Sequence, residues 1–107
     1  MFGEGRSCPN NIMIVGICKL TLHFPATQSL KDKRRILHKI KDRAASRFHV
    51  QIAEVGDQEL WQKAQLGFAL TGNSKVDIES LIQKLILFIE GLNAGEILNC
   101  EKEIIHF

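Results

Sequence analysis

Apolar side chains recur along this chain in two rhythms, one typical of β-strands and one typical of α-helices. Alternation over residues 12–24 predicts a first strand, one face of which is formed by Gly16, Cys18, Leu20, Leu22 and Phe24. Three further strands are expected at 49–55, 64–71 and 97–106. The inward residues are Val50 and Ile52 in the first of these and Leu66, Phe68 and Leu70 in the second, and Leu98, Cys100 and Ile104 share one face of the last. The alternation slips at Ala53 and Glu54, which indicates a bulge in the second strand.

Two other segments, 29–48 and 74–92, repeat apolar residues at spacings of three and four, as amphipathic helices do. Ser29 with Asp32, and Ser74 with Asp77, have the spacing of N-terminal capping boxes. The apolar side of the first helix is expected to carry Leu30, Ile36, Leu37, Ile40, Ala44 and Phe48. The second helix is expected to bury Ile78, Leu81, Ile82, Leu85, Phe88, Ile89 and Leu92.

The elements therefore follow the order βαββαβ. Two right-handed crossovers with a hairpin between them predict a ferredoxin-like α+β sandwich, in which two helices cover one face of a four-stranded antiparallel sheet. The length of 107 residues suits one domain, which we place at 12–107. Residues 1–11 are Gly-rich, polar and unpatterned, so we expect them to form a flexible N-terminal extension.

The first helix concentrates the positive charge of the chain. Residues 31–47 hold eight Lys and Arg against two Asp, a balance of +6, whereas the whole chain carries only +2. Lys31, Lys33, Arg34 and Arg35 crowd the first turns, where the helix dipole disfavours cations. Like charges also recur at four-residue steps from Lys31 to Arg47, which opposes helix stability. Two interpretations remain open: a face for an anionic partner, or a solvated helix surface.

The connection at 54–64 holds the only Trp of the chain in otherwise polar surroundings. Leu60 and Trp61 are expected either to fold back over the open end of the core, or to anchor a partner or a second copy of the chain. Three acids, Glu54, Asp57 and Glu59, lie in the same stretch. They can pair with the basic helix and lower its charge.

Several kinds of chemistry lack the residues they need. The three cysteines have no C-x-x-C spacing and the four histidines have no ligand spacing, so reduced thiols, no metal and no cofactor are expected. No nucleophile lies beside a base in the sequence, and no Arg-bearing anion cradle precedes the first helix, so we expect a non-enzymatic protein. Phe68 points inward, which disfavours base stacking on the sheet. We find no secretory signal and no membrane-spanning segment, and we expect a cytoplasmic protein.

Three blocks of sequence resemble one family. These are MIVG at 13–16, SLKDKRR at 29–35 and, most specifically, AEVGDQELWQKA at 53–64. They are similar to the YlxP-like family of bacterial proteins of unknown function. The resemblance implies a small cytoplasmic protein with the ferredoxin-like fold. It also implies RNA or ribosome association, because members commonly lie in gene neighbourhoods with transcription and translation factors. Met13 matches the usual family start, so residues 1–12 form an extension or follow a misplaced start.

The sequence thus predicts a non-enzymatic RNA- or ribosome-associated protein whose basic helix contacts phosphates. The expected contacts are Lys31, Arg34, Arg35, Lys39 and Arg43. The alternative is a homo-oligomeric interaction or small-ligand module without nucleic-acid contact. In that case Leu60 and Trp61, together with an exposed edge strand, form the interface of a homodimer.

Overall fold

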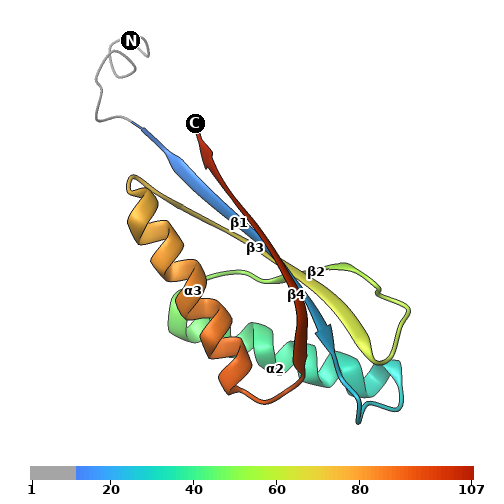
Figure 1. The fold of residues 1–107 in the computed structure, drawn as a ribbon. Helices are drawn as coiled ribbons and strands as arrows, with labels where there is room; N and C mark the ends of the chain where they lie inside the picture. Colours follow the sequence, from blue (N-terminus) through green and yellow to red (C-terminus); the bar gives the residue numbers. More distant parts are fainter. Residues whose placement is uncertain (1–11) are drawn as a thin grey trace.

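A computed structural model describes residues 12–107, and its six elements follow the predicted βαββαβ order (Figure 1). The elements are β1 (Ile14–His23), α2 (Leu30–Phe48), β2 (Ala53–Gly56), β3 (Lys63–Gly72), α3 (Lys75–Gly91) and β4 (Glu96–His106). Both predicted capping serines are confirmed. Ser29 Oγ accepts a hydrogen bond from the Asp32 amide at 3.1 Å, and Ser74 Oγ accepts one from the Asp77 amide at 3.4 Å. The extension expected at 1–11 lies outside the described residues.

The four strands form one antiparallel sheet in the order β2-β3-β1-β4. β1 is central and pairs along its length with both β3 and β4, so the edges are β2 and β4. Both helices pack on the same face of the sheet and leave the other face open (Figure 1). This arrangement is the predicted ferredoxin-like α+β fold.

The core lies between the sheet and the helices. Its buried members include the predicted inward residues of the two central strands, namely Cys18, Leu20, Leu22, Leu66 and Phe68. At Gly16 the helix α3 approaches β1 too closely for a side chain. A Cβ atom built there would lie 2.4 Å from Cγ2 of Ile78 and 2.8 Å from Cδ1 of Ile82. The contact between α3 and the sheet therefore depends on glycine at this position.

The second strand is shorter than predicted. The sequence pattern placed it at 49–55, but pairing with β3 begins at Ala53 and ends at Gly56. Val50 and Ile52 are buried as expected, although they precede the strand. The register shifts between Glu54 and Gly56, close to the predicted bulge. The alternation of apolar residues therefore predicted too long a strand, because the segment before β2 alternates between buried and exposed residues without pairing to β3.

The last strand corrects a second prediction. Thr21 pairs with Asn99 and Leu22 pairs with Ile97, so Leu98 is an extra residue in β4. This bulge reverses the alternation, and Ile97 packs against the core while Leu98 is 56% exposed. Cys100 is also exposed, because β4 is an edge strand.

One residue of the second helix was also misplaced. On α3 the buried stripe includes Ile86 in place of the predicted Leu81, which is exposed. The other expected positions of α3 are buried or pack partly against the core.

Candidate nucleic-acid interface and the adjoining loop

The outer side of α2 presents a row of cations, which we call the basic stripe. It consists of the five predicted contact residues, Lys31, Arg34, Arg35, Lys39 and Arg43, all of which are exposed. A guanidinium nitrogen of Arg35 lies 3.5 Å from Oδ1 of Asp32 on the same helix, and the Arg35 side chain remains largely exposed. Among the described residues, no carboxylate lies within ion-pair distance of the other four. The basic stripe is therefore open to solvent.

The stripe ends before the last turn of α2. The Arg47 guanidinium lies over the rings of Phe48 and Phe88, at 5.8 and 5.6 Å from their centroids. These two rings meet edge to face at 5.3 Å. Arg47 is thus held against the aromatic end of the helix pair, and its stem contributes to packing there.

Lys33 differs from every other cation of α2, because its side chain is only 1% exposed. Its ammonium group lies 2.8 Å from Oε2 of Glu54. It also donates hydrogen bonds to the backbone carbonyls of Asp57 at 2.9 Å, Lys63 at 3.1 Å and Gln58 at 3.4 Å. A buried charge is tolerated only when paired and hydrogen-bonded, and Lys33 meets both conditions.

From the sequence, Lys33 was counted among the cations that crowd the first turns of α2, and no structural role was expected for it. At 100° per residue, Lys33 falls four residues before Leu37 and seven before Ile40, in the middle of the buried side of α2. The charge of the residue concealed a position that the helical period already indicated. Lys33 is the residue whose role sequence reasoning missed.

The carbonyls that Lys33 binds belong to residues 57–63, which we call the Trp61 loop. Asp57 has a positive φ of 59°, and its Oδ2 accepts a hydrogen bond from Nε2 of Gln65 at 2.9 Å. The Gln62 side chain donates to the carbonyls of Pro25 and Thr27, at 3.2 and 3.0 Å. The Trp61 loop is therefore hydrogen-bonded both to α2 and to the segment that precedes α2.

The side chains of Leu60 and Trp61 lie on the outside of this loop, 47% and 53% exposed. Neither belongs to the buried core. They line a shallow pocket of about 460 Å³ together with His23 at the end of β1. A tethered backbone thus presents two half-exposed apolar side chains.

The acids near the loop do not neutralise the basic stripe. Glu54 pairs with the buried Lys33, and Oδ2 of Asp57 lies 3.9 Å from Nζ of Lys63. The pairing between acidic loop and basic helix that the sequence suggested is thus limited, in the described residues, to Lys33.

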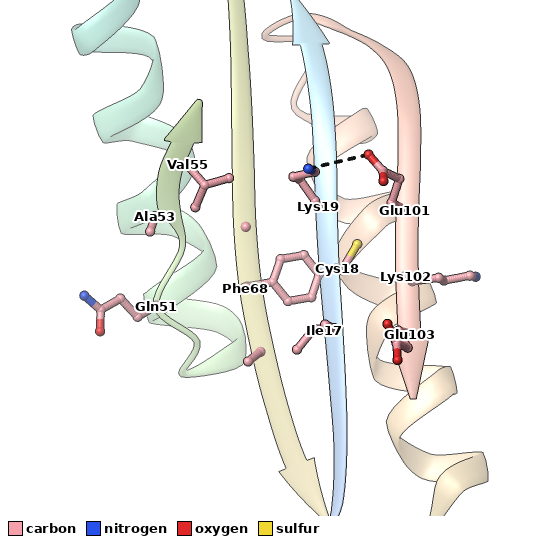
Figure 2. A pocket seen from close by; sticks show the side chains of 12 residues that line it. Ile17, Cys18, Lys19, Gln51, Ala53, Val55, Phe68, Glu101, Lys102 and Glu103 are labelled. Carbon is pink, nitrogen blue, oxygen red and sulfur yellow. Dashed lines mark ion pairs between the residues drawn. The ribbon is translucent and has the colours of Figure 1, made fainter. Parts of the chain in front are cut away.

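The open face of the sheet holds a broad hollow of about 860 Å³ (Figure 2). On one side, Val55 lies beside Gly67, and a Cβ atom built on Gly67 would lie 3.2 Å from Cγ1 of Val55. On the other side, Nζ of Lys19 lies 3.7 Å from Oε2 of Glu101. Phe68 is buried, as predicted. The outward positions of β1 and β3 carry no Phe, Tyr or Trp, so the open face of the central strands offers no such ring for base stacking.

Within residues 12–107, no group of three or more His, Cys, Asp or Glu side chains is placed to hold a metal ion. Neither α2 nor α3, the helices of the same part of the chain, is long and apolar enough to cross a membrane.

Comparison with known proteins agrees with the resemblance seen in the sequence. The chain is 39% identical over 62 residues to the uncharacterized protein YlxP of Bacillus subtilis (strain 168). These 62 residues cover 58% of this chain and 67% of that protein. Among solved structures, the de novo designed protein Foldit4 gives a TM-score of 0.47 at 14% identity, over 89% of this chain and 96% of that one. The model of the family described as protein of unknown function (DUF503) matches residues 15–102. The chain belongs to the DUF503 family, in which the YlxP-like proteins fall.

Proposed function

We propose that this protein is a non-enzymatic, cytoplasmic RNA- or ribosome-associated factor and that the basic stripe of α2 contacts the phosphate backbone. The proposal rests on the lack of ion pairs in the basic stripe, because four of its five cations have no carboxylate partner among the described residues. Arg35 retains a largely exposed guanidinium. Like charges at four-residue spacing cost the helix stability, so their retention on an unpaired surface favours a role in binding.

The dimensions of the stripe suit a phosphate backbone. The twelve residue-to-residue steps from Lys31 to Arg43 rise by about 18 Å along the helix axis. A strand of B-DNA carries one phosphate per roughly 3.4 Å of axis, and at that spacing the stripe spans about five phosphates of one strand. Lys and Arg contacts to phosphate give affinity without reading the sequence, and we therefore expect weak sequence preference and strong salt dependence.

The direct test is binding of the purified protein to ribosomal subunits and to bulk RNA across a salt series. We expect salt-sensitive retention on one subunit that exceeds retention on bulk RNA. Each phosphate contact contributes roughly 0.7–0.9 to the slope of log K against log salt. The absence of binding even at low salt would refute the proposal.

A pair of matched variants assigns the binding to α2. Changing Arg34, Arg35 and Lys39 to Gln removes three cations from the stripe, and changing Lys75, Lys84 and Lys102 to Gln removes three exposed cations elsewhere. We expect the first variant to lose binding and to fold with equal or slightly higher stability. The second should retain most of the wild-type affinity. Equal weakening by both variants would mean that net charge alone attracts RNA.

The exposure of Leu60 and Trp61 favours a second candidate, a homo-oligomeric or small-ligand module. If the Trp61 loop forms a homodimer interface, the fluorescence emission of Trp61 should be blue-shifted at high protein concentration and should move to the red on dilution. Emission that stays red at every concentration would exclude this interface. The wild-type protein suffices for the measurement, since Trp61 is the only Trp of the chain.

A further inference from the structure

Two cysteines far apart in the sequence lie side by side on β1 and β4. The Sγ atoms of Cys18 and Cys100 are 4.0 Å apart, and both residues are free thiols. Cys18 is buried in the core, whereas Cys100 is exposed on the edge strand. The pair thus joins one protected thiol to one that solvent reaches.

The strand register explains the contact. Leu20 pairs with Cys100 and Cys18 pairs with Lys102, so the two cysteines are diagonal neighbours. Diagonal Cα atoms on antiparallel strands lie roughly 7–8 Å apart, while disulfides need about 4.4–6.8 Å. Closing the bond therefore requires the two cysteine Cα atoms to come closer by about 1 Å. An edge strand paired on one side can move in this way, and the bulge at Leu98 lies two residues from Cys100.

We propose that Cys18 and Cys100 are a peroxide-sensitive thiol pair that closes to an intramolecular disulfide. The Cys100 thiol loses its proton, and the thiolate attacks a peroxide oxygen and breaks the O–O bond. The departing hydroxide takes up that proton, which gives a sulfenic acid on Cys100 and one water. The Cys18 sulfur then attacks the Cys100 sulfur, forms the S–S bond and expels the hydroxyl group as a second water. The two thiols lose two hydrogen atoms in total, and hydrogen peroxide is reduced to two molecules of water.

The surroundings divide the two roles between the residues. Burial, with a smaller contribution from Cys100, raises the pKa of the Cys18 thiol to about 12, so Cys18 stays protonated near neutral pH. Cys100 is the accessible thiol and therefore meets the oxidant first. Lys102 favours the charged form of Cys18, and so assists loss of its proton during the second step.

The disulfide would act on the least supported part of the sheet. Within residues 12–107, β4 pairs only with β1, and a bond from Cys100 to Cys18 ties this edge strand to the central strand. The bond closes a long loop of chain, so the oxidised protein should melt several degrees above the reduced protein.

The experiment uses the full chain with Cys8 changed to Ser, which removes the third thiol. After treatment with one equivalent of hydrogen peroxide, intact mass should fall by two hydrogen atoms, and neither remaining cysteine should react with iodoacetamide in denaturant. A non-reducing peptide map should contain one species that links Cys18 to Cys100, and dithiothreitol should reverse the change.

Two control variants make the outcome decisive. With Cys100→Ser added, Cys18 should stay unmodified, and with Cys18→Ala added, Cys100 should proceed to sulfinic acid or to a disulfide between two chains. The proposal is overturned if the parent protein gives these Cys100 products while Cys18 still takes up iodoacetamide in denaturant. Because Cys100 is exposed, the Cys100→Ser variant should fold normally and keeps the test valid if Cys18→Ala does not fold.

Discussion

Lys33 connects α2 to the Trp61 loop, and its removal should destabilise the whole domain. We consider the change Lys33→Met, which keeps a long apolar stem and removes the ammonium group. The variant leaves the Glu54 carboxylate without its partner, and it leaves three backbone carbonyls without the donor that Lys33 supplies.

The magnitude follows from these contacts. Removing one partner of a buried ion pair lowers the free energy of unfolding by about 3–5 kcal/mol. The whole free energy of unfolding of a small domain is only about 5–15 kcal/mol. For a domain near 100 residues this corresponds to a fall in Tm of roughly 12–25 °C. Adding Glu54→Gln should recover only part of the loss, because the carbonyls of Asp57, Gln58 and Lys63 still lack the donor that Lys33 supplied.

The assay is urea denaturation followed by far-ultraviolet circular dichroism, with Lys39→Met as the matched control on the exposed side of the same helix. We expect the control to change the free energy of unfolding by less than about 0.5 kcal/mol. Lys33→Met should also accelerate hydrogen exchange in residues 57–63 under native conditions. A loss below about 1 kcal/mol for Lys33→Met would refute the view that this side chain supports the loop.

Two further predictions concern the backbone. Gly16→Ala should lower the free energy of unfolding by about 1–3 kcal/mol, because its Cβ collides with Ile78. Gly91→Ala, which meets no atom within 4 Å, should be neutral or stabilising, and equal losses in thermal melts of both variants would contradict this explanation. His49 ends α2 with a positive φ of 56°. Because glycine adopts this conformation without strain, His49→Gly should raise the free energy of unfolding by about 1 kcal/mol. An unchanged or lower Tm would show that the left-handed turn is not strained.

The central part of the fold could be predicted from the sequence because its strands are covered consistently. β1 and β3 have neighbours on both sides and helices on one face, so their alternation between buried and outward residues is regular. The edge strands have fewer constraints, and both contain register shifts. One inserted residue reverses the alternation beyond it, which is why Leu98 was wrongly assigned to the same face as Cys100 and Ile104.

The candidate site could be predicted only in part, for a different reason. Exposed cations follow directly from the helical period, and all five members of the basic stripe lie on the solvent side of α2. The partners of a buried cation are distant in sequence, so the helical period does not identify them. The partners of Lys33 are at 54–63, and no local pattern connects them to 33.

Lys33 helps to distinguish structural from functional residues in the two longest sequence blocks that resemble the YlxP-like family. The blocks at 29–35 and 53–64 are joined through its side chain. Lys33 and Gln62 are explained by the fold, because their side chains donate hydrogen bonds to backbone carbonyls of other segments. Arg34 and Trp61 belong to the same blocks, yet their side chains are exposed, and the fold does not account for them. Residues of this second kind are where we expect the binding function, and Lys33→Met should alter the surroundings of Trp61 more than those of Arg34.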